Sequence, residues 1–112
     1  KLAGTNIVLA VEPLNTLVDH AGYFLERSDV AAQILAAVNA KEVKLLFDIY
    51  HQQITEGNLI NNIVKYLPLV AHFHVADNPG RHQPGTGEIN YRNVFTAIDQ
   101  AGYTGYARRA IR

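Results

Sequence analysis

The stretch Val43-Lys44-Leu45-Leu46-Phe47-Asp48 is an apolar run that ends in an acid, and it decides the fold. Its length and composition predict a strand over 43–49 of the kind that is buried in a parallel sheet. Asp48 then stands at the carboxyl end of that strand, which is the end where parallel α/β folds bind their ligands. The sequence therefore predicts a parallel sheet with one functional edge.

Other segments of the chain repeat this pattern. Apolar runs predict further strands over 7–14, 69–76 and 106–112, and Glu12 and His74 lie near the ends of the first two. Apolar stripes with helical spacing predict helices over 28–39, 58–67 and 90–102, with Ser28, Asn58 and Asn90 as N-caps. The segments that follow strands are long and polar, whereas the links that follow helices are short. This asymmetry is typical of the functional and structural faces of an α/β barrel.

The length and composition of the chain limit the number of domains and the kinds of partner that it can have. The chain has 112 residues and 48% apolar residues, so we expect one α/β domain over 1–112. A complete barrel takes about 250 residues, so the chain corresponds to half of one.

The formal net charge is zero and there is no cysteine. These features argue against nucleic-acid partners, disulfides and thiolate metal sites. No apolar run approaches the roughly 20 residues of a membrane helix. We expect a cytoplasmic protein without a membrane partner.

Glu12, Asp48 and His74 offer two carboxylates and one imidazole at the ends of three successive strands. An unpaired carboxylate in such a place would cost several kcal/mol to bury, so a cation is implied. These ligand types suit Mg²⁺, Mn²⁺, Co²⁺ or Zn²⁺ about equally. The alternative is that each acid caps its own loop or pairs with Arg81. Three such positions in consecutive units favour the metal site.

Several nearby side chains keep more than one interpretation. His72 shares a face with His74, so either imidazole can reach a central ion. His51, past the strand end, either contacts a substrate oxygen, orients Asp48, or is a solvated loop residue. Arg81 either clamps a substrate carboxylate or is a surface arginine in a turn. Glu88 either joins the ligand set or closes its loop.

Four motifs together resemble the xylose-isomerase-like barrels and, among them, most closely the hydroxypyruvate isomerases. These motifs are Val11–Asn15, Phe47–Gln53, His72–Arg81 and Gln83–Tyr91. The resemblance implies that the chain is the C-terminal half of a (β/α)8 TIM barrel with parallel strands and outer helices. It also implies a divalent metal, Mg²⁺ or Mn²⁺, and a small hydroxy-carbonyl substrate. The implied reaction interconverts hydroxypyruvate and tartronate semialdehyde by proton transfer through an enediolate.

The same resemblance assigns roles to individual residues. Glu12 would be a metal ligand and a catalytic acid/base residue, and Asp48 and His74 would complete the ligand set. His51 and Arg81 match substrate-binding positions. His74 departs from the glutamine that hydroxypyruvate isomerases often have, and matches the histidine of ketose 3-epimerases, so a 3-epimerase is the alternative enzyme.

One expected residue is missing. The family has a second catalytic glutamate on its last strand, where this chain has Ala110, flanked by Arg108, Arg109 and Arg112. Three arginines suit a buried strand poorly, so we interpret these last residues as a truncated product or an altered reading frame. The isolated chain is then expected to be nearly inactive. We expect it to form a homo-oligomer or to pair with an N-terminal half. A non-catalytic, self-associating half-barrel is the third hypothesis, and the neutral charge disfavours a DNA-repair endonuclease.

Overall fold

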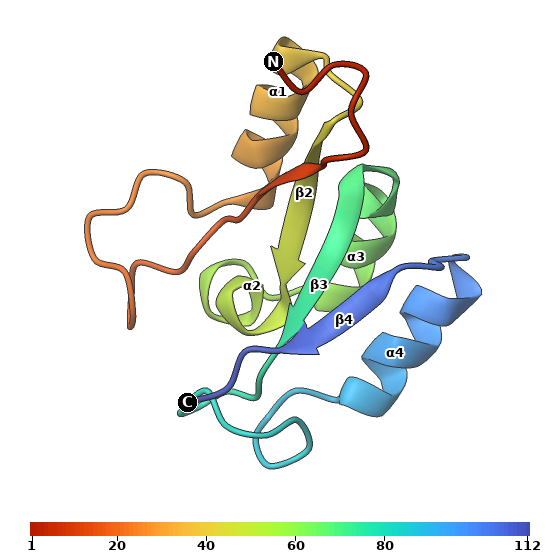
Figure 1. Cartoon of the computed structure of the whole chain (residues 1–112). Coiled ribbons are helices and arrows are strands. Elements are labelled where there is room, and N and C mark those ends of the chain that lie inside the picture. The colour runs from red at the N-terminus through yellow and green to blue at the C-terminus, as the bar shows by residue number, and fades with distance from the viewer.

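A sheet of four parallel strands organises the molecule, and the computed structural model describes all residues from 1 to 112. The strands are β1 (Leu9–Val11), β2 (Val43–Asp48), β3 (Val70–Val75) and β4 (Tyr106–Arg109). They lie in the order β1-β2-β3-β4, so each strand pairs with its neighbours along the chain (Figure 1). The predicted parallel α/β architecture is confirmed. The strands are shorter than predicted at both ends of the chain.

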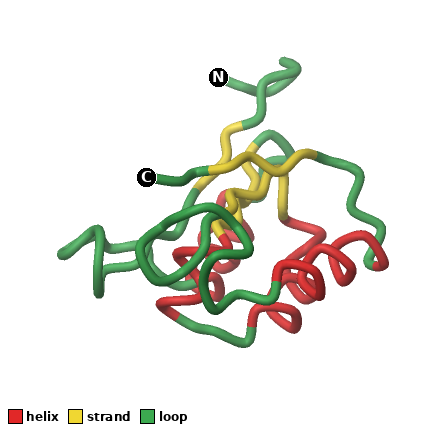
Figure 2. Tube along the Cα trace, turned by 90° about the horizontal axis from the view of Figure 1, so that it is seen from below, coloured by secondary structure: helices red, strands yellow, loops and turns green.

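The helices lie on one side of this sheet, as Figure 2 shows. They are α1 (Ser28–Val38), α2 (Ile49–Thr55), α3 (Leu59–Tyr66) and α4 (Tyr91–Gln100), and a short 3-10 helix, η1, spans Leu67–Leu69. The three helices that the sequence predicted correspond to α1, α3 and α4. Helix α2 was not predicted, because the segment after Asp48 was interpreted as a loop.

The core lies between the sheet and the helices. Leu45 and Phe47 of β2 and Phe73 of β3 are almost wholly buried, and the rings of the two phenylalanines lie 5.9 Å apart. Because side chains alternate along a strand, the residues between them face the opposite side of the sheet. That opposite side carries Asp48 and His74, which are partners in the β2–β3 register. Packing of the apolar face therefore fixes where the polar residues point.

The expectation of buried strands holds only for the centre of the sheet. All four residues of β4 are exposed, including Arg108 and Arg109. The prediction that these arginines stand in a buried strand is wrong, because β4 is an edge strand and solvent can reach their guanidinium groups. Two apolar residues, Leu9 on β1 and Tyr106 on β4, are also exposed, so both edges of the sheet are open.

The residues at the helix ends follow the prediction only in part. Asn39 ends α1 in the left-handed conformation, and Asn90 caps α4 by accepting a hydrogen bond from the Asn93 N–H, both as predicted. Ser28 does not cap α1, because Arg27 takes that position and the Ser28 hydroxyl donates to Gln52 instead. Asn58 occupies the N-cap position of α3, but its side chain accepts no bond from the helix backbone.

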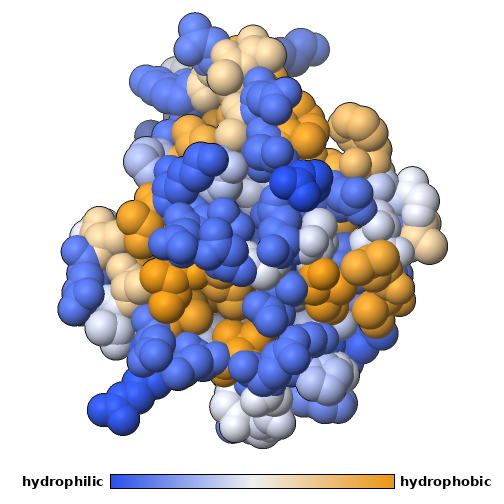
Figure 3. Space-filling view, turned by 180° about the vertical axis from the view of Figure 1, so that it is seen from behind, coloured by the Kyte–Doolittle hydropathy of each residue, from blue (hydrophilic) through white to orange (hydrophobic).

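The helix-covered side is hydrophilic with separate apolar patches, as Figure 3 shows. Among the exposed apolar side chains of the helices are Val38, Ile60, Val64 and Phe95. None of the helices combines the length and the hydropathy that crossing a membrane requires.

Candidate metal centre

The three predicted metal ligands meet at the carboxyl end of the sheet. Glu12 follows β1, Asp48 ends β2, and His74 stands next to last in β3. The Nδ1 atom of His74 lies 3.3 Å from Oε1 of Glu12 and 3.7 Å from Oδ2 of Asp48. The structure therefore brings together two carboxylates and one imidazole from three neighbouring strands.

Helix α2 adds His51 to this group. Asp48 is the N-cap of α2, and its Oδ1 atom accepts a hydrogen bond of 3.0 Å from the His51 N–H. The first turn of the helix then carries the His51 ring back over the strand end, so that its Nε2 atom lies 4.0 Å from Oδ2 of Asp48. Polar atoms of Glu12, Asp48 and His51 lie within 4.8 Å of one another. His51 is wholly buried and is not the loop residue that one interpretation allowed.

Two buried polar atoms at this point have no hydrogen-bond partner, Oδ2 of Asp48 and Nε2 of His51. A buried carboxylate oxygen without a donor is costly unless a cation neutralises it. Oxygen and imidazole ligands in such a group are those that divalent metals take in proteins. The residues present therefore fit a divalent metal ion, and the donor set does not select one metal.

Burial and mutual repulsion shape the charges of the site. Burial raises the pKa of Glu12, and the nearby Asp48 carboxylate raises it further, while His74 opposes both. Burial lowers the pKa of His51; Asp48 raises it, and the positive charge of Arg81 again lowers it. Glu12 therefore holds a proton more readily than an ordinary glutamate, and His51 favours its neutral form.

We expect metal binding at this site to release protons. A metal ligand must be deprotonated, and the raised pKa of Glu12 makes protons compete at higher pH than they do for an ordinary glutamate. The affinity for Mg²⁺ should therefore fall as the pH is lowered from about 7 to about 5. Calorimetric titrations in two buffers of different ionisation enthalpy would count the protons released. Equal affinities across this range would contradict competition between protons and the metal at this site.

Arg81 lies on the loop that follows β3 and is tied to the end of the chain. Its Nε–H donates to the Ala110 carbonyl at 3.0 Å, and its guanidinium lies 5.4 Å from the centre of the Tyr50 ring. The terminal nitrogens of Arg81 make no hydrogen bond within the chain. Guanidinium donors that are not used within the chain can bind a carboxylate in bidentate fashion. The clamp role of Arg81 stays a prediction.

Sequence reasoning missed the residue that shapes this loop, Asp77. Its carboxylate is wholly buried and accepts backbone N–H bonds from Asn78, Gly85 and Ile89 at 2.7–3.0 Å. Gly87 passes so close that an added Cβ would lie 2.6 Å from the Asp77 carboxylate. The cluster of Pro and Gly residues in 79–87 was a signal that this loop is tightly built. Asp77 is the residue on which it is built.

Glu88 and Ala110 also have defined places. Glu88 is exposed and accepts hydrogen bonds from Asn78 and Gln53, so it closes its loop and does not join the ligand group. Ala110 follows β4, and its N–H donates to the Val75 carbonyl at 3.0 Å. In this register it shares the face of His74, which is the face of the candidate metal centre. No acidic side chain reaches the centre from β4.

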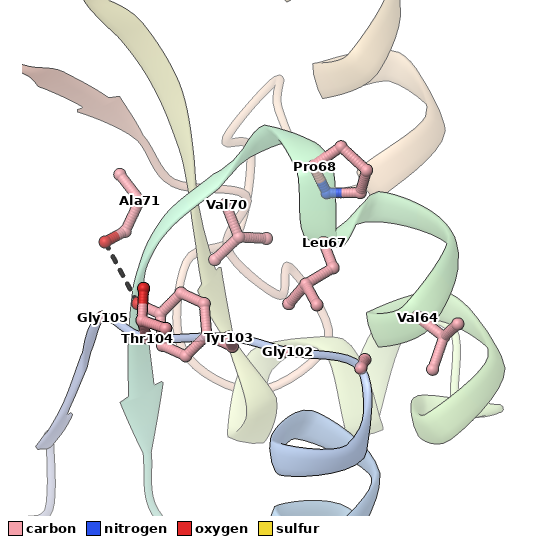
Figure 4. A pocket seen from close by; sticks show the side chains of 10 residues that line it. Val64, Leu67, Pro68, Val70, Ala71, Gly102, Tyr103, Thr104 and Gly105 are labelled. Atoms are coloured by element: carbon pink, nitrogen blue, oxygen red, sulfur yellow. Dashed lines mark hydrogen bonds between the residues drawn. The ribbon is translucent and has the colours of Figure 1, made fainter.

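The largest pocket lies at the other end of the sheet. It has a volume of about 630 Å³ and is formed by the end of α3, the start of β3 and the link between α4 and β4 (Figure 4). In this pocket the Tyr103 hydroxyl donates to the Ala71 carbonyl at 3.1 Å. Its lining is mostly apolar and has no acid, histidine or arginine. This pocket therefore has no part in the chemistry of the candidate site.

Curated relatives share the sequence of this chain over part of their length. A hydroxypyruvate isomerase of Escherichia coli (strain K12) is 38% identical over 101 residues, covering 90% of this chain and 39% of the relative. A 2-oxo-tetronate isomerase of Cupriavidus necator is 38% identical over 104 residues, covering 93% and 40%. The chain thus spans about two fifths of the length of these relatives. The predicted resemblance to hydroxypyruvate isomerase is confirmed.

Solved structures show the same fold. One titled AP endonuclease, family 2, from Brucella melitensis has a TM-score of 0.89 at 35% identity, covering 94% of this chain and 40% of that one. A 3-keto-D-glucoside 4-epimerase from E. coli has a TM-score of 0.85 at 32% identity, covering 97% and 39%. The family described as xylose isomerase-like TIM barrel matches residues 1–108. This chain belongs to the xylose isomerase-like TIM barrel family.

Proposed function

We propose that this chain carries the metal-binding and proton-transferring part of an isomerase for a small hydroxy-carbonyl substrate. We take hydroxypyruvate as the leading substrate and tartronate semialdehyde as its product. One observation carries the proposal: Glu12, Asp48 and His74 converge at the carboxyl ends of three adjacent strands, with a buried carboxylate oxygen that lacks a partner. The names of the hydroxypyruvate and 2-oxo-tetronate isomerases support the reaction class.

The reaction moves one proton between neighbouring carbons. The base takes a proton from the hydroxymethyl carbon, an enediolate forms, and a proton returns to the former carbonyl carbon, while the hydroxyl and carbonyl oxygens exchange roles. A bound Mg²⁺ or Mn²⁺ would supply Lewis-acid stabilisation of the negative charge that develops on the two oxygens. Glu12 suits the proton transfer, because a raised pKa brings a carboxylate closer to the operating pH.

The remaining residues orient the substrate in this proposal. Arg81 has unused guanidinium donors and would take the carboxylate. His51 would contact a substrate oxygen next to the metal. Ala110 stands where the resemblance expects the second catalytic glutamate, so the chain has one of two acid/base groups. We therefore propose that the chain by itself binds metal and substrate but turns over little of it.

We expect Arg81→Gln to weaken hydroxypyruvate binding to the Mg²⁺-loaded chain by about tenfold, since a charge-assisted hydrogen bond is lost. Calorimetry would measure it. Hydroxyacetone replaces the carboxylate by a methyl group and should bind equally to both proteins. Arg92→Gln, at an exposed position of α4, is the matched control. Equal losses for both ligands would assign Arg81 to loop support. Failure of the metal-loaded parent chain to bind hydroxypyruvate would contradict the proposed function.

A ketose 3-epimerase is the second candidate, because His74 matches the histidine that the resemblance gives to ketose 3-epimerases as third metal ligand. A sugar epimerase also shares the fold at 32% identity. The two candidates differ in the ligand that they prefer. If a six-carbon ketose such as D-fructose binds the metal-loaded chain more tightly than hydroxypyruvate does, the epimerase is favoured.

We also propose a partner for the open sheet edges. β1 and β4 each lack a neighbour on one side and expose apolar residues, and such edges tend to pair with other strands. A second copy of the chain or an N-terminal half-barrel could be the partner that pairs with these edges. A non-catalytic, self-associating half-barrel would show the same concentration-dependent association without binding hydroxypyruvate.

A further inference from the structure

Distances alone leave two roles for His51 at the candidate metal centre. Its Nε2 atom lies within reach of Asp48 and Glu12, so it can be a metal ligand through a lone pair or a hydrogen-bond donor through a proton. In a neutral imidazole one ring nitrogen is a donor and the other an acceptor. The partners of the opposite nitrogen, Nδ1, therefore decide the role of Nε2.

Asn15 surrounds Nδ1 of His51 with donors. The backbone N–H of Asn15 points at this nitrogen from 3.3 Å, and the side-chain Nδ2 of Asn15 lies 2.7 Å from it. Both groups can only donate, so Nδ1 must accept and carries the lone pair. The proton of the neutral ring is then on Nε2. Asn15 and His51 are both wholly buried, so water does not compete for these bonds.

The orientation of the Asn15 amide is fixed independently of His51. Its Oδ1 atom accepts from the backbone N–H groups of Val18 at 2.9 Å and Asp19 at 3.2 Å. Its Nδ2 atom also donates to Oδ2 of Asp19 at 2.8 Å. A rotated amide would set its NH₂ group against two N–H donors and its oxygen against a carboxylate. These three contacts therefore agree on one orientation.

We propose that Asn15 is a positioning residue that holds His51 as its Nε2–H tautomer, so that His51 donates a hydrogen bond to a substrate oxygen and is not a metal ligand. A histidine that binds metal through Nε2 donates its Nδ1–H to an acceptor. His51 shows the reverse arrangement. The protein ligands are then Glu12, Asp48 and His74. The substrate contact rests on the proposed function, whereas the tautomer is a property of the chain alone.

NMR correlation of the ring protons with the ring nitrogens reads this tautomer directly. In the wild-type chain His51 should be a single Nε2–H form, whereas the exposed His82 should show a mixture. Asn15→Asp sets a carboxylate oxygen against Nδ1, so we expect Nδ1 to become protonated. The ratio of protonated to unprotonated Nδ1 should rise at least about tenfold. Asn61→Asp, at an exposed position of α3, is the matched control and should change nothing at His51.

Three results would overturn the inference: a His51 mixture like that of His82, an unprotonated Nδ1 in Asn15→Asp, or loss of the Nε2 proton on saturation with Mg²⁺. If Asn15→Asp does not fold, the two wild-type measurements still decide. Absence of any Mg²⁺-dependent shift at His74 would count against the proposed metal site. It would leave the tautomer result standing, so the two failures are distinguishable.

Discussion

Asp48→Asn should lower the affinity of the chain for Mg²⁺ or Mn²⁺ by roughly a hundredfold or more. Loss of a residue that only supports a ligand already costs about 10–100-fold, and Asp48 is a ligand itself in the proposed metal site. Asparagine keeps the oxygen that accepts from the His51 N–H, so the start of α2 should survive the change. Calorimetric titration with each metal would measure the loss.

The same variant has a second expected result. In the metal-free protein, Asp48 is buried and raises the pKa of Glu12 by repulsion. Neutralising it should leave the thermal midpoint unchanged or raise it, as measured by circular dichroism. Asp99→Asn, on the exposed side of α4, is the control and should alter neither quantity. Unchanged metal affinity in Asp48→Asn would remove this residue from the site.

Asp77→Ala should destabilise the chain by about 3 kcal/mol, because it leaves several buried backbone N–H groups without an acceptor. The loop over 78–89 depends on these bonds, so its amide protons should exchange with solvent much faster in the variant. Denaturant unfolding and hydrogen exchange would measure the two effects. Exchange in α1, which contributes no hydrogen bond to the Asp77 carboxylate, should change only through the global stability.

The stabilisation from Asp77 should depend on pH. Burial alone raises its pKa, but backbone N–H bonds, led by that of Ile89, outweigh burial and hold the pKa below the ordinary 3.8. A depressed folded pKa means that the stabilisation is complete above the unfolded value and is lost as the pH falls through the folded value. The difference in stability between wild type and Asp77→Ala should therefore shrink below about pH 4. A constant difference would contradict this account.

The centre of the fold could be predicted from the sequence because its signals are local. The apolar runs of β2 and β3 and the stripes of α1, α3 and α4 each lie within one short window. Helix α2 was missed because it starts directly after β2 and spans only Ile49–Thr55. Burial of β4 was predicted wrongly, because exposure at a sheet edge depends on neighbours and not on the strand itself.

The residues of the candidate site also divide into those that the sequence could predict and those that it could not. Glu12, Asp48 and His74 could be placed together because strand ends in a parallel sheet share one edge. Asn15 and Asp77 could not be singled out, because their partners are backbone N–H groups and a ring nitrogen supplied by turns and loops. The bonds of Asn15 to His51 connect positions 36 residues apart. Only the folded chain shows that these two polar residues are buried.

The order of the strands has a consequence for how the molecule assembles. Each strand pairs with the strand that precedes it in the chain, so no pairing must wait for a distant segment. We infer that β2 can dock on β1, β3 on β2 and β4 last, so that each strand joins an edge that the preceding strands already form. The chain can thus acquire its shape in the direction of its synthesis.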